Sequence, residues 1–229
     1  MMHQLPLDLR VYDHPSFENF WPGKNAVALD LVRTLVAGAH GPLYLFGPEG
    51  SGKTHLLLAA ARAAAERGAA CAYLSLAETS EAQWEGLVDI RSDAMVCIDD
   101  IDGLHAQPQW EHRLFVLLES LAPLRRIIFA GRSNPAGLAL GRDDLGTRLA
   151  SGPVLALRAL SDEAKGEALR HRASIRGLSL SASAVHYLLT HGPRDLGALF
   201  HLLARLDQET LVDGRKLTIP YLRQVLARL

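Results

Sequence analysis

The string GPEGSGKT at residues 47–54 restricts the folds open to this chain more than any other feature of the sequence. It satisfies the pattern G-x-x-x-x-G-K-[ST] in full and lies between the apolar run PLYLFG and the alanine- and leucine-rich string KTHLLLAAARAAAER. A glycine-rich turn between a buried strand and a helix is the context of a phosphate-binding loop. Its backbone N–H groups point at phosphate oxygens, and the helix adds its positive dipole end. The string therefore predicts a P-loop nucleotide site.

Side chains within this loop have separate predicted roles. Lys53 is expected to reach the β- and γ-phosphates, and Thr54 to place its hydroxyl on Mg²⁺. The other nucleotide-binding candidates of the loop are Pro48, Glu49, Gly50, Ser51, Gly52 and His55. The predicted ligand is ADP or ATP with Mg²⁺.

A pair of carboxylates follows a second apolar run. In MVCIDD four apolar residues precede Asp99 and Asp100, which places both at the carboxyl end of a buried strand, where ligand sites open in parallel sheets. Asp99 is predicted to hold Mg²⁺ through its water shell, and Asp100 to orient or deprotonate an attacking water. We assign Asp102, two residues further on, to the solvated loop.

The strand and helix patterns define the fold class. Helical patterns alternate with five apolar runs that predict strands. These runs span residues 42–47, 69–76, 94–100, 126–131 and 153–157. Nearly continuous apolar strands are typical of a parallel sheet covered by helices on both faces. After Leu160 only helical patterns follow. We predict an α/β P-loop domain, a three-layer parallel sheet over residues 14–158, and a small all-helical lid domain over 159–229.

Composition excludes several classes of protein. The net charge is −1 and the pI is about 6.8, so no global positive field would hold the chain on nucleic acid. Cys71 and Cys97 both lie in apolar runs, which indicates buried thiols in a reducing compartment rather than a disulfide. No apolar run reaches eighteen residues, and no signal-peptide pattern opens the chain. We expect a cytoplasmic protein with no membrane contact.

Taken together, these motifs resemble those of AAA+ ATPases of the bacterial replication-initiator branch, and in particular the Hda-type DnaA-related regulators. FENFWPGKNAVAL (17–29) is similar to the family segment that helps form the adenine pocket, which implies this role for Phe17 and Phe20. TRLASG resembles the family's Box VII and GPRDLGAL its sensor 2. The resemblance, which covers residues 14–229, implies that Arg148 is an arginine finger and that Arg194 acts at the nucleotide.

The chain departs from the family pattern in its sensor-1 region. The string IIFAGRSNPAGL carries Arg132, Ser133 and Asn134 where related initiators often have an acidic residue. We leave open which of these three side chains contacts the γ-phosphate. The sequence also has no segment for the helix-turn-helix DNA-binding domain of an initiator, so we expect DNA to be reached through a partner.

The amino-terminal string QLPLDL suggests that partner. Gln4, Leu5, Leu7 and Leu9 resemble the short peptide with which replication proteins dock into the hydrophobic cleft of the β sliding clamp. Pro6 favours an extended chain, in which the leucines can fill an apolar pocket. We predict that residues 1–13 form an extended clamp-binding tail.

The resemblance implies a regulator of replication initiation. With nucleotide bound and docked on the DNA-loaded clamp, it would stimulate ATP hydrolysis by DnaA, while its own ATPase stays weak and a homo-oligomer remains possible. Two alternatives stay open: an ATP-driven loader of helicase or clamp, and an initiator-docking adaptor that uses nucleotide only to hold its shape. Stimulation of ATP hydrolysis by DnaA distinguishes the regulator from the loader, and dependence of that stimulation on Arg148 distinguishes the regulator from the adaptor.

Overall fold

The computed structural model describes residues 14–78, 80, 94–104, 107–120, 126–213 and 217–228. The chain divides into two compact units, one spanning Ser16–Ala159 and one containing Leu160–Leu229. Each is described by itself below. The predicted clamp-binding residues Gln4, Leu5, Leu7 and Leu9 lie outside the described residues.

A five-stranded parallel sheet forms the centre of the first unit, as predicted. Its strands are β1 (Gly41–Phe46), β2 (Cys71–Ser75), β3 (Met95–Asp99), β4 (Arg126–Gly131) and β5 (Val154–Ala156), in the order β2-β3-β4-β1-β5. All neighbouring pairs of strands in this order are parallel. Each strand coincides with one of the five apolar runs in the sequence.

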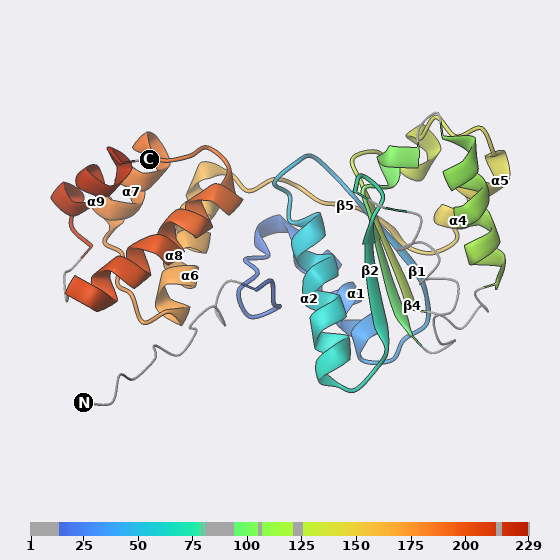
Figure 1. The fold of residues 1–229 in the computed structure, drawn as a ribbon, viewed down its shortest axis with the longest axis horizontal. Coiled ribbons are helices and arrows are strands. Elements are labelled where there is room, and N and C mark those ends of the chain that lie inside the picture. Colours follow the sequence, from blue (N-terminus) through green and yellow to red (C-terminus); the bar gives the residue numbers. More distant parts are fainter. Residues whose placement is uncertain are drawn as a thin grey trace. The chain divides into compact units, whose positions relative to one another are not determined.

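Helices cover both faces of this sheet and give the three-layer architecture (Figure 1). Helices α1 (Ala26–Val36) and α2 (Lys53–Glu66) pack on one face, in a core that includes Leu43 and Leu45 of β1. Helices α4 (Pro108–Ser120) and α5 (Asp143–Leu149) pack on the other, in a core that includes Tyr44 and Phe129. Because side chains alternate along a strand, β1 supplies both cores. Short 3₁₀ turns occur at Gly23–Asn25, Ile101–Leu104 and Pro135–Gly137.

The second unit is helical throughout its described part, as predicted for the lid. It contains α6 (Asp162–Ile175), α7 (Ala182–His191), α8 (Leu196–Asp213) and α9 (Ile219–Leu226). The Ser161 and Ser181 side chains cap the first two helices by accepting from backbone N–H groups three residues on. Leucines from α6 to α9 form a core of their own. No helix among the described residues is long and apolar enough to cross a membrane.

Candidate nucleotide site and arginine surface

The carboxyl ends of four strands meet at one edge of the sheet, and the predicted motifs lie there. In the strand register, Ser75 at the end of β2 pairs with Asp99 at the end of β3. Phe46 at the end of β1 pairs with Gly131 at the end of β4. The P-loop, the acidic pair and the sensor-1 string therefore leave the sheet side by side, although they are far apart in the sequence.

The P-loop backbone has the conformation that its glycines were predicted to supply. Gly52 has φ +91° and directly precedes α2, and a Cβ there would lie 2.7 Å from the Phe20 ring. At Gly47 a Cβ would lie 2.3 Å from the carbonyl oxygen of Leu157. No other residue fits either position without moving its neighbours. The loop is thus held tightly by the segments around it.

Polar groups inside the loop suit a phosphate. Lys53 Nζ donates to the carbonyl oxygens of Gly47 and Pro48 at 2.7 and 2.9 Å, and so curls back over the loop. Ser51 Oγ is buried without a hydrogen-bond partner in the described part of the chain. A phosphate oxygen would give Ser51 Oγ a partner and could accept the third N–H of the Lys53 ammonium group. The residues present therefore fit the predicted nucleotide.

Burial has the largest influence on the pKa of Lys53. It lowers the pKa of the ammonium group, and the nearby carboxylates Asp99, Asp102 and Asp100 act in the opposite direction. The positive charge of Arg132 also lowers this pKa. The ammonium group of Lys53 is therefore within electrostatic range of these three carboxylates and of Arg132.

Asp99, the predicted Mg²⁺ residue, is almost completely buried, with 1% of its surface exposed. Its Oδ2 accepts a hydrogen bond from the Tyr73 hydroxyl at 3.2 Å, and its Oδ1 accepts from the backbone N–H of Asp100 at 2.9 Å. Burial and the Asp99 charge raise the pKa of Tyr73, so the phenol stays protonated and donates. Thr54, the second predicted Mg²⁺ residue, is exposed at the start of α2. Carboxylate and hydroxyl oxygens are the ligands that Mg²⁺ prefers.

Asp100, the predicted water-orienting residue, has an unusual backbone. Its φ is +55°, and it is the one non-glycine residue with positive φ among those described. Aspartate tolerates this left-handed region better than most residues. The Ser75 hydroxyl donates to Asp100 Oδ2 at 2.7 Å and fixes the direction of the side chain. The adjacent Asp99 and Asp100 carboxylates thus accept from two different side chains of β2, Tyr73 and Ser75.

The prediction that Asp102 belongs to the solvated loop is wrong. Its carboxylate is half-buried and accepts from the backbone N–H groups of Arg132, at 2.5 Å, and Ser133, at 3.2 Å. The Tyr44 hydroxyl donates to the Ser133 carbonyl oxygen at 3.0 Å from the other side. Asp102 therefore holds the sensor-1 string in place.

The sensor-1 candidates differ in what their side chains do. Asn134 caps the turn Pro135–Gly137 by accepting from the Ala136 N–H at 3.0 Å. Arg132 is exposed, and its guanidinium forms no ion pair within the described part of the chain. Its backbone follows Gly131, whose carbonyl oxygen accepts from the N–H of Gly47 at 3.2 Å. Arg132 is thus the cationic side chain next to the start of the P-loop.

The two aromatic candidates for the adenine pocket occupy different places. Phe20 lies against the P-loop at Gly52, and its ring centroid is 5.3 Å from that of His55. His55 Nε2 in turn lies 2.9 Å from the Ser16 carbonyl oxygen. Phe17 packs in the core, with the Arg33 guanidinium 5.5 Å from its ring centroid. Phe20 and His55 thus join the amino-terminal segment to the P-loop helix, whereas Phe17 faces α1.

Asn25 is a residue of this region that sequence reasoning missed. Its buried amide exchanges two hydrogen bonds of 2.8 Å with the backbone of Arg158 and lies 3.5 Å from the Ser51 carbonyl oxygen. It therefore ties the P-loop to the chain that leaves β5. A lone asparagine before a helix usually reads as a cap, so the sequence carried no separate signal for this role.

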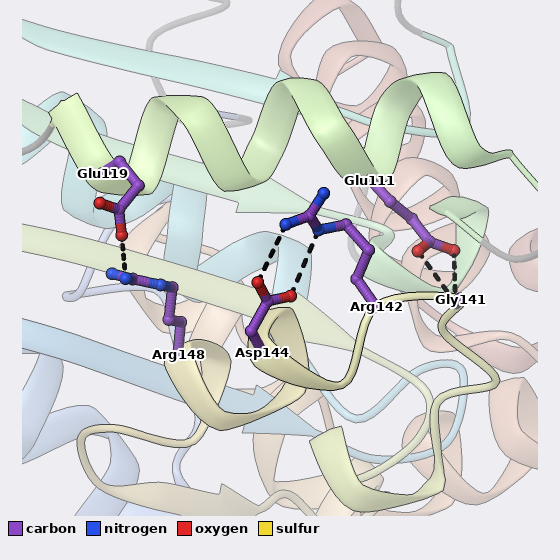
Figure 2. Close-up of polar contacts among 6 residues, drawn as sticks. All are labelled: Glu111, Glu119, Gly141, Arg142, Asp144 and Arg148. Atoms are coloured by element: carbon purple, nitrogen blue, oxygen red, sulfur yellow. Dashed lines mark hydrogen bonds and ion pairs between the residues drawn. The ribbon is translucent and has the colours of Figure 1, made fainter.

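Arg148 lies on α5 and points to α4, in the layer opposite the P-loop helix. Figure 2 shows its guanidinium reaching Glu119 on α4, with which it forms an ion pair. The Arg148 Cζ atom is 5.1 Å from the ring centroid of Phe115. Its side chain is 42% exposed, so the group remains open to a partner.

Arg194, the predicted sensor-2 arginine, belongs to the helical unit. It is exposed and directly precedes Asp195, whose side chain accepts from the Ala198 N–H at 2.7 Å at the start of α8. Its role at the nucleotide stays a prediction.

This geometry defines a class of protein: a P-loop domain of the AAA+ type, followed by a helical lid. A family model of the bacterial DnaA ATPase domain matches residues 12–156, and a model of the Hda lid domain matches residues 162–226. The chain belongs to the DnaA-related AAA+ family and is Hda-like in its combination of the two parts.

Solved structures support the same fold. Domain III of the Thermotoga maritima replication initiation protein DnaA is 20% identical, with a TM-score of 0.76 and 98% of both chains covered. A replication initiator DnaA bound to AMPPCP and single-stranded DNA is 22% identical, with a TM-score of 0.69 over 87% of this chain and 67% of that one. The Thermotoga maritima RuvB Holliday junction branch migration motor is 16% identical, with a TM-score of 0.60 over 93% and 74%. At these identities the likeness concerns the fold.

Proposed function

We propose that this chain binds ADP or ATP with Mg²⁺ in its own P-loop and uses Arg148 to stimulate ATP hydrolysis by DnaA. In this proposal residues 4–9 dock on the DNA-loaded β sliding clamp, so that DNA is reached through the clamp. The outcome is an inactive, ADP-bound initiator and therefore negative regulation of replication. The nucleotide analogue bound to related DnaA supports the choice of ligand.

The position of Arg148 carries this proposal. The arginine is partly exposed on α5, in the core layer shared with α4, whereas the P-loop helix α2 packs on the opposite face of the sheet. An arginine beside a transferring phosphoryl group stabilises its transition state, and such a residue is often supplied by a neighbouring molecule. Arg148 is suited to a nucleotide held by a partner.

The chain's own site has the residues to retain nucleotide. Lys53 and the loop N–H groups would bind phosphate oxygens, while Thr54 and Asp99 would hold Mg²⁺, which neutralises phosphate charge when bound. Arg194 of the lid is the predicted second cation. Asp100 Oδ2 accepts from Ser75, which leaves Oδ1 to accept a proton from water. We expect weak turnover here, because Arg148 serves another molecule.

A reconstituted assay tests the proposal. Purified DnaA loaded with labelled ATP is mixed with clamp on DNA and with this protein, and hydrolysis is followed in a single turnover. We expect stimulation by the unmodified chain and its loss in Arg148→Ala, since trans arginines contribute about 10³–10⁵ in rate in comparable systems.

Each alternative gives a different result in this assay. Full stimulation by Arg148→Ala would support the adaptor. Turnover of this chain's own ATP that rises with a helicase or clamp substrate, with no change at DnaA, would support the loader. Hydrolysis that rises with this protein's own concentration in the absence of DnaA would assign Arg148 to a second copy of the chain.

A further inference from the structure

Two side chains from other segments bind the backbone of the sensor-1 string. The two carboxylate oxygens of Asp102 accept from the N–H groups of Arg132 and Ser133, at 2.5 and 3.2 Å. The Tyr44 hydroxyl donates to the Ser133 carbonyl oxygen at 3.0 Å. Both N–H groups and the carbonyl oxygen belong to the main chain. These contacts therefore fix the path of the backbone at Arg132 without engaging its guanidinium.

Gly131, directly before these residues, has no room for a side chain. A Cβ there would lie 2.6 Å from the Tyr44 hydroxyl oxygen and 3.0 Å from Asp102 Oδ2. The Gly131 carbonyl oxygen accepts from the N–H of Gly47, the first residue of the P-loop, at 3.2 Å. Tyr44 and Asp102 thus meet at the residue that also contacts the P-loop.

The core of the α4 layer anchors both of these side chains. Tyr44 is completely buried, and its ring centroid is 6.3 Å from that of Phe129. Asp102 lies in the turn Ile101–Leu104, whose two end residues are completely buried in the same core. Burial and the Asp102 charge raise the pKa of Tyr44, so its hydroxyl stays protonated and donates. Neither side chain can shift without disturbing this core.

The guanidinium of Arg132 is exposed, and its charge acts at the predicted phosphate site. Burial lowers the pKa of Lys53, and the Arg132 charge lowers it further. A long side chain on a fixed backbone has fewer positions to search, so its contact with a phosphate loses less entropy. ADP has no γ-phosphate. Order at Arg132 should therefore favour ATP alone.

We propose that Asp102 and Tyr44 are positioning residues for Arg132: by binding the backbone of residues 132 and 133 they restrict its guanidinium to the region of the P-loop, and so raise the affinity for ATP over that for ADP. This inference rests on the proposed function in one respect, namely that the P-loop binds nucleotide. It assigns selectivity between the two nucleotides to side chains that act through the sensor-1 backbone.

Two variants remove these contacts and leave Arg132 in place. Asp102→Asn keeps the shape but offers one acceptor oxygen to two N–H groups, and Tyr44→Phe removes only the hydroxyl. Equilibrium titration with Mg-ATP and Mg-ADP gives the ratio of the two dissociation constants. We expect the preference for ATP, relative to the unmodified chain, to fall about three- to fivefold in Asp102→Asn and about twofold in Tyr44→Phe. The ratio is the readout because the lost carboxylate charge alters the affinity for both nucleotides.

The lid supplies matched controls. Asp162→Asn removes an exposed carboxylate that pairs with Lys165. Tyr221→Phe removes a hydroxyl that donates to Glu209 at 3.0 Å. Neither control variant should change the ratio of the dissociation constants.

A double variant shows whether Asp102 acts through Arg132. Arg132→Ala combined with Asp102→Asn should have the same ratio as Arg132→Ala alone, because nothing is left to position. A further fall in the double variant would overturn the inference. So would an unchanged ratio in folded Asp102→Asn or Tyr44→Phe. An unmodified chain that binds neither nucleotide would refute the proposed function, whereas equal weakening of ATP and ADP in these variants would refute the inference alone.

Amide NMR tests the backbone contacts in the nucleotide-free protein. The N–H protons of Arg132 and Ser133 donate to a carboxylate, so they should resonate downfield and exchange slowly with solvent. In Asp102→Asn at least one of them should move upfield and exchange faster, and Asp162→Asn should leave both signals in place. Unchanged signals in Asp102→Asn would refute the contact, whether or not the chain binds nucleotide.

Discussion

Replacing Lys53 with methionine tests the nucleotide site most directly, because the structure separates its effect on the free protein from its effect on the complex. In the free protein the ammonium group donates to two loop carbonyl oxygens, at 2.7 and 2.9 Å, and its pKa is lowered chiefly by burial. The hydrogen bonds and the burial cost oppose each other. Methionine of similar length should therefore change the stability of the free protein by no more than about 1 kcal/mol.

The complex should respond much more strongly. A ligand at a hundredfold excess over Kd stabilises its protein by about 2.7 kcal/mol. For chains of this size about 1 kcal/mol corresponds to roughly 2–4 °C, so Mg-ATP or Mg-ADP should raise the melting temperature of the unmodified chain by about 5–11 °C. Lys53→Met should show no such rise, because the phosphate loses the lysine of the P-loop.

The assay is thermal unfolding with and without each nucleotide. Lys165→Met is the matched control, since Lys165 pairs with Asp162 on α6 of the lid and should keep the full rise. An equal rise in Lys53→Met and the unmodified chain would refute the assignment of residues 47–54 as the nucleotide site. It would also remove the basis of the proposed function.

Three further predictions concern other parts of the molecule. Arg132→Ala should weaken ATP binding about tenfold and ADP binding less than twofold, as equilibrium titration would measure, because a charge-assisted contact to the γ-phosphate is lost; equal weakening of both would contradict the sensor-1 role. Gly52→Ala should cost about 1–3 kcal/mol in urea unfolding, since φ is +91° and the new Cβ meets Phe20; an unchanged midpoint would show that the loop relaxes freely. Replacing Gln4, Leu7 and Leu9 together by alanine should abolish pull-down by purified β clamp at an unchanged melting temperature, because two buried leucines contribute about 1.5–3 kcal/mol each; retained binding would leave the tail without this role.

Local patterns were sufficient to predict the fold and the main motifs of the site. The strands are short apolar runs, and the P-loop follows β1 directly, so each of these signals is local in the chain. The lid helices α6 and α7 begin at the serine caps Ser161 and Ser181. Features of this kind need no knowledge of which elements become neighbours.

The features that escaped prediction are contacts between distant segments. Asp102 and Arg132 are 30 residues apart, and Asn25 and Arg158 are 133 apart. In each pair a side chain forms a hydrogen bond with a backbone group. Because almost every residue has the same backbone groups, the sequence does not indicate which of them becomes the partner. The contact between Glu119 and Arg148 escaped for a related reason: many exposed ion pairs are equally compatible with the composition of α4 and α5.

The separation of Arg148 from the P-loop follows from strand order and handedness. Connections between parallel strands are right-handed, so the direction in which the chain crosses the sheet decides which face its helix covers. In the order β2-β3-β4-β1-β5 the chain moves one way from β1 to β2, through α2, and the opposite way from β3 to β4 and from β4 to β5, through α4 and α5.

The P-loop helix and the helix that carries Arg148 must therefore lie in opposite layers. Leu145 and Leu149 of α5 are fully buried in the core of their layer, so Arg148 could not reach the chain's own P-loop helix without unpacking both leucines. Losing two such side chains from a core would cost about 1.5–3 kcal/mol each. The same topology that forms the nucleotide site thus keeps Arg148 in the layer opposite the P-loop helix, as its proposed role at a second molecule requires. For this reason Lys53→Met and Arg148→Ala should affect nucleotide retention and DnaA stimulation through separate steps.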